Sequence, residues 1–316
     1  MLPSSAQPRS LTVTGAVEAH ASVVEATPMT TFRQVALADF QGPLYLAWVG
    51  TDANHTLNIA VSTDGITFGH SIQPFGRGNS DSAPALTVFD GKLWMAWTGT
   101  DANHTLNLAS SANGTTWTQA TQPLGRNNSP TGPAISGFNG RLYYGWMGTD
   151  SKGSVNLASS SDGVNFTAPA HPGNNTTYKG LGLFDGISSL YISFPATNSD
   201  HTLWVAQTTD GVHVFNQELL SAGTNHQPSV TAAAEGGFVI AFTDHADNLA
   251  IIPYKGLPIQ PPAELLGPVI ESPTVADAGD FGVEYAWVDR HNEIWVMSCS
   301  DGPPPAGQPN VQAPFC

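Results

Sequence analysis

Residues 44–68 read LYLAWVGTDANHTLNIAVSTDGITF, and residues 93–117 read LWMAWTGTDANHTLNLASSANGTTW. Residues 142–166, LYYGWMGTDSKGSVNLASSSDGVNF, repeat the pattern, and three weaker copies follow. One aromatic residue marks each of the six copies, at intervals of 49, 49, 48, 48 and 45 residues: Trp48, Trp97, Trp146, Phe194, Phe242 and Trp287. A period near 48 residues is typical of architectures in which each copy forms one supersecondary unit.

Each copy divides into four short segments with the residue content of β-strands. In the second copy these segments are 83–89, 92–98, 105–110 and about 115–122, and they are rich in Val, Leu, Thr and aromatic residues. Gly, Asn, Asp and Pro separate the segments, as expected for tight turns. Six four-stranded units of this length predict an all-β fold, a six-bladed β-propeller of antiparallel blades.

The chain is expected to have three parts. The repeats occupy residues 29–302, an N-terminal segment covers residues 1–28, and residues 303–316 form a Pro-rich tail. The last repeat reaches this tail before a fourth strand can be recognised. We expect the N-terminal segment to supply that strand through residues 11–14, because a closed ring leaves no exposed sheet edge.

The composition excludes several classes of protein. Only 11% of the 316 residues are charged, and 10 Lys and Arg against 25 Asp and Glu give a net charge of −15. So few basic residues cannot form the positive face that a nucleic-acid-binding protein needs. No run of 18 apolar residues predicts a membrane span, and no motif indicates a metal or a cofactor, so none is expected.

The two cysteines, Cys299 and Cys316, lie 17 residues apart near the C-terminus. A disulfide between them would favour an oxidising compartment, and two unpaired thiols are the alternative. Residues 1–15 lack the apolar stretch of a signal peptide. The expected location is nevertheless secreted or extracellular.

A Ser-x-Asp-Gly or Ser-x-Asn-Gly turn recurs between the third and fourth segments. The copies read STDGITF (62–68), SANGTTW (111–117) and SSDGVNF (160–166), with a looser TTDG at 208–211. This pattern resembles the Asp-box of sialidase-like propellers, although each copy has one residue fewer between Asp and Gly. The resemblance implies a β-propeller and a structural role for these turns, on the face opposite the active face. Physically, the Asp or Asn side chain caps turn amides and Gly supplies positive φ.

The turns between the second and third segments gather polar residues on the other face. They read GTDANHT at 50–56 and 99–105 and GTDSKGS at 148–154, and the connections between repeats add GRGNSD (76–81) and GRNNS (125–129). Side chains of these types bind sugar hydroxyls as donors and acceptors. The candidate ligand-binding residues are Asp52, His55, Arg77, Asp101, His104, Arg126 and Asp150.

Each candidate also has a structural interpretation. The three aspartates can cap their own turns, and the two histidines can be exposed loop residues without a ligand. Arg77 and Arg126 can instead tie one repeat to the next.

A sialidase-like glycoside hydrolase with one central site is the catalytic alternative. The resemblance implies three arginines around a substrate carboxylate; Arg33 loosely matches the first, whereas Arg77 and Arg126 are repeat equivalents of each other. Candidate carboxylates for hydrolysis are Glu235, Glu271, Glu284 and Asp289, and no spacing singles out a pair. The sequence leaves catalysis open and leans towards a protein that is not an enzyme.

The function that the sequence favours is lectin-like binding of a carbohydrate or glycoconjugate. Similar polar loops in the first three repeats would give several sites around the ring, and repetition would give avidity for a multivalent glycan surface. A propeller that binds proteins is a further alternative.

Overall fold

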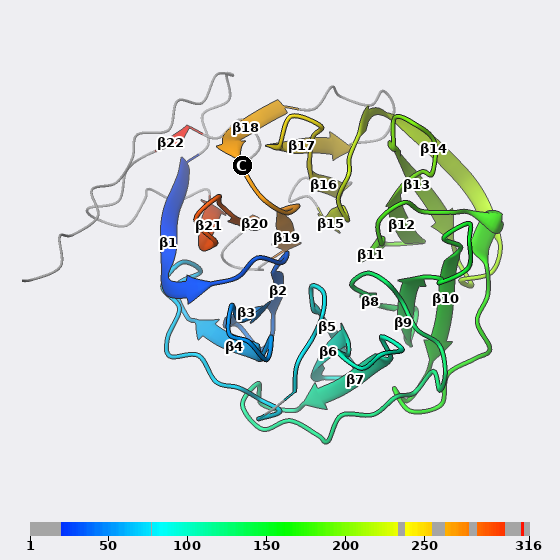
Figure 1. Ribbon diagram of the computed structural model, residues 1–316, viewed down its shortest axis with the longest axis horizontal. Coiled ribbons are helices and arrows are strands. Elements are labelled where there is room, and N and C mark those ends of the chain that lie inside the picture. Colours follow the sequence, from blue (N-terminus) through cyan, green and yellow to red (C-terminus); the bar gives the residue numbers. More distant parts are fainter. Residues whose placement is uncertain are drawn as a thin grey trace, which may run out of the picture.

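The computed structural model describes residues 20–76, 78–232, 238–254, 263–277, 283–300 and 311–312. Within these ranges the chain forms six antiparallel sheets, arranged as blades around one axis (Figure 1). The innermost strands of neighbouring blades contact each other in a closed circuit: β2, β5, β8, β11, β15, β19 and again β2. The six-bladed β-propeller predicted from the repeat is confirmed.

The blades follow one another along the chain. Blades 1 to 3 each contain three regular strands: β2 (Ala36–Asp39), β3 (Leu44–Val49), β4 (Leu57–Ser62); β5 (Ala85–Phe89), β6 (Lys92–Thr98), β7 (Leu106–Ser111); β8 (Ala134–Phe138), β9 (Arg141–Met147), β10 (Val155–Ser160). Blades 4 and 5 contain four: β11 (Gly182–Asp185), β12 (Leu190–Pro195), β13 (Thr202–Thr208), β14 (Val214–Gly223); β15 (Ser229–Ala232), β16 (Phe238–Thr243), β17 (Asn248–Tyr254), β18 (Ala263–Pro268). A short 3-10 turn, η1 (Pro172–Asn174), lies between blades 3 and 4.

Blade 6 is completed by the N-terminal part of the chain. Its strands are β19 (Thr274–Asp277), β20 (Val283–Val288) and β21 (Glu293–Ser300), followed in the sheet by β1 (His20–Thr30) and β22 (Val311–Gln312). β1 pairs antiparallel with β21 from His20 opposite Ser300 to Thr30 opposite Glu293. The strand thus extends across the boundary between residues 28 and 29, at which the repeats were expected to begin.

Tight turns form where the sequence predicts them. Asp90 and Gly91 join β5 to β6 with φ of 50° and 66°, and Asn139 and Gly140 join β8 to β9 with φ of 46° and 69°. Positive φ at both central residues is the type I′ geometry that matches the twist of paired strands.

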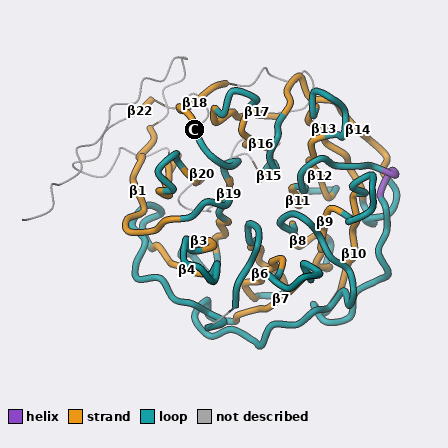
Figure 2. Tube along the Cα trace, viewed as in Figure 1, coloured by secondary structure: helices purple, strands orange, loops and turns teal. Residues whose placement is uncertain are grey.

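The outer segments of blades 1 to 3 are less regular than predicted. In blade 2 the expected strand at 115–122 pairs with β7 only at isolated positions, Trp117 opposite Ser111 and Thr121 opposite Leu108. The register shifts by one residue between these two pairs. The Ser110 amide donates to the Thr118 hydroxyl rather than to a carbonyl, which interrupts the ladder. Figure 2 shows loop at the rim beyond β4 and β7.

The apolar core lies between the blades. The six aromatic residues that mark the repeats are all on second strands and are at most 5% exposed: Trp48, Trp97, Trp146, Phe194, Phe242 and Trp287. Clusters combine side chains of adjacent blades, as where Tyr45 of blade 1 and Trp97 of blade 2 belong to one cluster. Burial of large aromatic side chains is a main favourable term in such cores.

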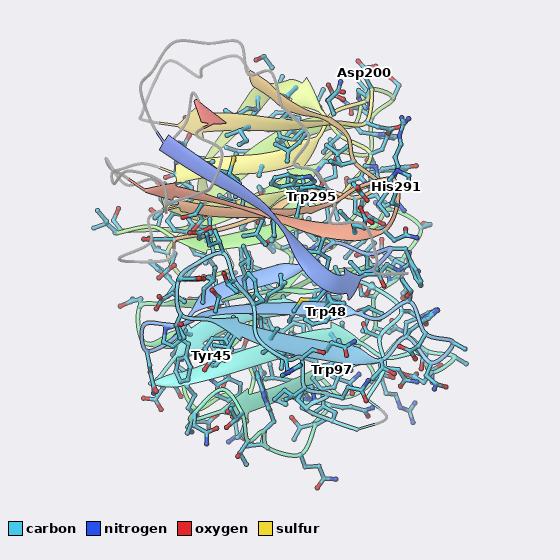
Figure 3. The ribbon with its side chains drawn as sticks, turned by 90° about the vertical axis from the view of Figure 1, so that its left-hand side faces the viewer. Tyr45, Trp48, Trp97, Asp200, His291 and Trp295 are labelled. Carbon is cyan, nitrogen blue, oxygen red and sulfur yellow. The ribbon has the colours of Figure 1, made fainter. Side chains whose placement is uncertain are left out.

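The propeller has two faces of different character. The turns from second to third strands and the connections between blades lie on one face, which we call the loop face. Seen across the ring, Asp200 and His291 lie on this side, and Tyr45 lies towards the opposite one (Figure 3).

Some sequence expectations fall outside the described residues. These are residues 11–14, Arg77, Glu235, Cys316, the side chain of Cys299 and most of the 303–316 tail.

Candidate functional site

The aspartates of the second-to-third-strand turns hold their own loops together. Asp52 accepts hydrogen bonds from the Asn54 and Thr56 amides and from the Thr56 hydroxyl, at 2.9–3.2 Å. Asp101 and Asp150 make the same three contacts in blades 2 and 3. Partial burial acts to raise the pKa of Asp52, but these hydrogen bonds outweigh it and lower the pKa. The structure therefore gives the three carboxylates a structural role.

The histidine of each turn connects the loop to the next blade. His55 and His104 adopt positive φ of 53° and 52°, and Gly153 takes the equivalent place in blade 3. The carbonyl of His55 accepts the Ser80 amide, and that of His104 accepts the Ser129 amide. The residue that follows each of these serines therefore lies beside two successive loops.

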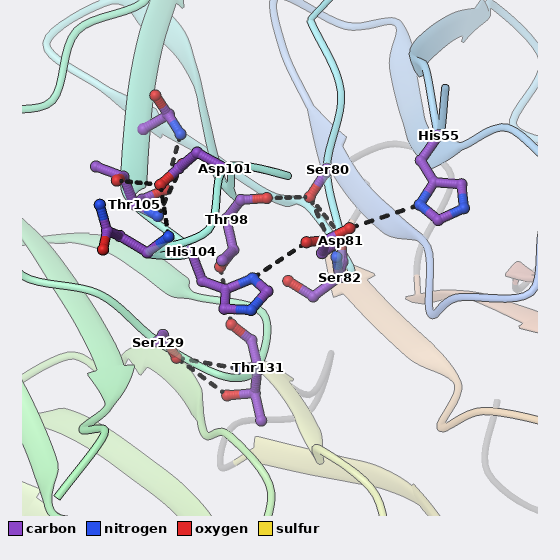
Figure 4. A network of polar contacts seen from close by, with 12 residues as sticks. His55, Ser80, Asp81, Ser82, Thr98, Asp101, His104, Thr105, Ser129 and Thr131 are labelled. Atoms are coloured by element: carbon purple, nitrogen blue, oxygen red, sulfur yellow. Dashed lines mark hydrogen bonds and ion pairs between the residues drawn. The ribbon is translucent and has the colours of Figure 1, made fainter. Parts of the chain in front are cut away.

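Asp81, the residue after Ser80, joins His55 and His104 into one polar network (Figure 4). Its Oδ2 lies 3.1 Å from His104 Nδ1, and its Oδ1 lies 3.6 Å from His55 Nδ1. The network presents two imidazole rings and a carboxylate at the junction of blades 1 and 2.

Blades 3 to 5 carry a second cluster at corresponding positions. Tyr178, which follows Thr177, stacks on His201 with ring centroids 3.6 Å apart and planes at 12°. His201 Nδ1 lies 2.6 Å from Asn225 Oδ1, and His245 Nε2 lies 2.9 Å from the Asp200 carbonyl oxygen. Aromatic and hydrogen-bonding groups thus meet on the loop face here as well.

The structure places the predicted site residues in different surroundings. The structure brings His55 and His104 together, whereas the three aspartates point into their own turns. Arg126 is exposed, and Arg77 lies outside the described residues. Asp81, Tyr178 and Asn225 were missed because they occupy a position that varies from blade to blade. The signal that could have found them is their place directly after the recurring Ser or Thr.

The central channel is lined by small and apolar residues of the innermost strands. Its described lining contains Ala36, Ala85, Leu183 and Val275 and has no Arg, Lys, Asp or Glu. Two glutamines cross it: Gln34 Nε2 donates to the Pro273 carbonyl at 3.1 Å, and Gln227 Nε2 donates to the Leu181 carbonyl at 2.9 Å. This part of the channel therefore offers no charged catalytic group, and the aspartates of the innermost strands, Asp39, Asp185 and Asp277, lie at the ends of β2, β11 and β19, outside this lining.

The described carboxylates proposed for hydrolysis lie in different surroundings. Glu271 is half-buried and pairs with His226, with Oε2 3.1 Å from Nδ1. Asp289 accepts the His291 and Glu293 amides of its own turn. Glu284 is fully buried near the other end of β20, about 16 Å along the strand from Asp289. Burial raises the pKa of Glu284 to about 9, against a smaller lowering by the Ser298 hydroxyl.

Two further properties concern the described residues alone. No group of three or more His, Cys, Asp or Glu side chains there is placed to hold a metal ion. No helix in the described part of the chain is long and apolar enough to cross a membrane.

Comparison with known proteins places the chain by its fold. No protein-family model and no curated protein matches it. The Aleuria aurantia lectin, in complex with Fucα1-6GlcNAc, matches with a TM-score of 0.61 and 12% identity over 88% of this chain and 99% of the lectin. The shared fold is the β-propeller.

Two other solved propellers illustrate the range of similarity. AofleA from Arthrobotrys oligospora matches with a TM-score of 0.65 and 9% identity, over 93% of this chain and 90% of that protein. A Hadza microbial sialidase matches with a TM-score of 0.63 and 14% identity over 85% of this chain. The propeller spans only 65% of the length of that sialidase. At these identities the similarity establishes a common architecture.

Proposed function

We propose that this propeller is a carbohydrate-binding, lectin-like protein that binds glycans through its loop face. The observation that carries the proposal is the His55–Asp81–His104 network. It gathers two imidazole rings and a carboxylate at the surface, and groups of these types hydrogen-bond to sugar hydroxyls. The Tyr178–His201–Asn225 cluster adds an aromatic surface for the apolar face of a sugar. The lectin among the structural neighbours supports the same class of ligand.

The other features of the molecule fit this proposal. We assign the Ser-x-Asp-Gly turns of the opposite face to the Asp-box class with a structural role, because Asp64 accepts the amides of Ile66 and Thr67. We also propose an extracellular place of action, where glycan surfaces are displayed.

Binding to the loop face is tested by exchanging one histidine on each face. His104→Asn removes the ring of the network but keeps a residue that tolerates positive φ. His213→Asn is the matched control, because His213 is also an exposed histidine beside a carboxylate, 2.7 Å from Asp210, on the opposite face. After a glycan array has identified a ligand, calorimetry should show that His104→Asn weakens binding by about tenfold or more. The His213→Asn protein should bind as the parent does, and equal affinities in all three proteins would overturn the proposal.

The hydrolase alternative shares the fold evidence but not the chemistry of the channel. A sialidase is among the structural neighbours, yet the described channel lining has no charged residue. Release of fluorophore from fluorogenic sialosides and hexosides, abolished by Glu271→Gln, would establish a hydrolase in place of a lectin.

A further inference from the structure

A cavity of about 530 Å³ opens between blade 6 and blade 1, and we call it the Trp48 groove. Trp48 and Phe68 of blade 1 and Met29 of β1 form its apolar floor, since the three belong to one hydrophobic cluster. Asp52, Asn58, His70 and Ser71 are among the polar residues that line it. The volume lies in the range of pockets that hold one small ligand.

The next two junctions between blades have equivalent aromatic residues in their walls, but there an apolar side chain of the protein fills the groove. In blade 2, Trp97 and Trp117 take the places of Trp48 and Phe68. Phe75, from the outer segment of blade 1, stacks on Trp97 with ring centroids 4.7 Å apart and meets Trp117 edge-on at 5.8 Å. The protein's own side chain therefore fills this groove.

Leu124 occupies the corresponding place at the junction of blades 2 and 3. It lies five residues before Ser129, as Phe75 lies five before Ser80. Leu124 is buried and belongs to one cluster with Trp146 and Phe166. Two successive junctions are thus closed by an apolar side chain from the preceding blade.

Ring closure explains why the Trp48 groove stays open. The outer segment of blade 1 leaves its ladder at a turn, in which the Gly76 amide donates to the Gln73 carbonyl, and this turn inserts Phe75. The outer strand of blade 6 is β1, which pairs with β21 as far as Glu25 and again at Thr30, with a shift of register between these two pairs. The irregular stretch between them presents Met29 to the groove, which stays open beside it.

The chemistry of the groove indicates the class of ligand. An apolar floor accepts the C–H face of a sugar ring, and the rim supplies acceptors and donors for its hydroxyls. Asp52 is the only Asp, Glu, Lys or Arg among the residues that line the groove. Its negative charge would repel a carboxylated sugar such as a sialic or uronic acid.

We propose that the Trp48 groove binds one neutral pyranose ring. The proposal rests on the glycan-binding function proposed above and names one site and the charge class of its sugar. It also assigns Phe75 and Leu124 as built-in plugs of the equivalent grooves.

The first test blocks the groove. Ser71 is exposed and lines the groove, and Ala120 is the exposed equivalent residue at the plugged junction. Calorimetry with methyl α-L-fucoside, methyl galactosides, methyl mannosides and the methyl glycoside of a sialic acid should give binding of a neutral sugar and none of the methyl sialoside. Ser71→Trp should lower the affinity by about tenfold or more, and Ala120→Trp should leave it within about twofold. Thermal unfolding confirms that both variants are folded.

The outcomes separate this inference from the proposed function. Failure of the parent protein to bind any glycan would contradict both. Glycan binding that survives Ser71→Trp but is lost in His104→Asn would overturn the groove alone, as would preference for the methyl sialoside.

The second test opens a plugged groove. Phe75→Ala removes the ring over Trp97 and should add one binding site per chain in the same titration. An unchanged number of sites in a folded Phe75→Ala protein would contradict the equivalence of the grooves.

Discussion

Glu284 holds, on β20, the position that Tyr45, Trp94 and Tyr143 hold on the second strands of blades 1 to 3, three residues before the marker Trp. Its side chain is fully buried. Burial, with a smaller contribution from the nearby Asp64 carboxylate, raises its pKa to about 9. In the folded ring the residue is thus a neutral carboxylic acid at neutral pH.

This gives a predicted dependence of stability on pH. The ordinary pKa of 4.5 applies in the unfolded chain, so between about pH 4.5 and 9 the folded state binds one more proton than the unfolded state. The free energy of unfolding should therefore be largest below pH 4.5 from this group and fall as pH rises towards 9. Glu284→Gln mimics the protonated acid, so its free energy of unfolding should not fall in this way. The difference in free energy of unfolding between the variant and the parent should be on the order of a few kcal/mol more favourable to the variant at pH 8 than at pH 5. Urea unfolding across this range measures the difference, and parallel profiles would refute it.

The candidate site shows which residues a repeat can predict. His55 and His104 were predicted because two near-identical loops place a histidine at the same position. Asp81 was not, because the equivalent positions hold Pro130 and Tyr178, so no periodic signal marks it. The contact that makes the site is between residues of two blades, and the sequence of one repeat does not encode it.

The Ser-x-Asp-Gly turns allow a prediction about a single element. Gly163 has φ of +73°, and a Cβ there would collide with the Trp94 ring, whereas Gly140 has φ of +69° with open space around it. Gly140→Ala should cost about 1–2 kcal/mol from backbone strain alone. Gly163→Ala should cost about 1–3 kcal/mol more, since the ring must move. Chemical denaturation of both variants measures the two costs, and equal values would show that the turn does not pack against blade 2.

At the scale of strands, the prediction succeeded where hydrophobic alternation and turn residues agree. The segment predicted at 92–98 is β6, Lys92–Thr98. The outer segments were predicted less well because their Thr hydroxyls accept amides that would otherwise donate to carbonyls of the paired strand. The Ser110 amide donates to the Thr118 hydroxyl, and the Ser159 amide donates to the Thr167 hydroxyl. Strand propensity alone does not reveal this competition.

At the scale of the whole molecule, the sequence predicted six blades from the period and closure from the missing last strand. It placed the closing strand at residues 11–14, whereas the strand that pairs with β21 is His20–Thr30, which is not a copy of the outer segments elsewhere. The strand pairs with β21 as far as Glu25 and again at Thr30, and the open groove lies beside the irregular stretch between these pairs.

Removal of the closing strand tests how far the ring depends on it. A chain that begins at Thr31 lacks β1, so the edge of β21 is left unpaired and Met29 is lost from the cluster with Trp48. Unpaired strand edges lower stability and favour association between chains. We expect the melting temperature to fall by at least about 10 °C, since the lost pairing and burial amount to several kcal/mol, and size-exclusion chromatography should show aggregates. A chain that begins at His20 keeps β1 and is the matched control. If the two truncated chains melt together, β1 contributes little to closure, and the Trp48 groove would need another wall.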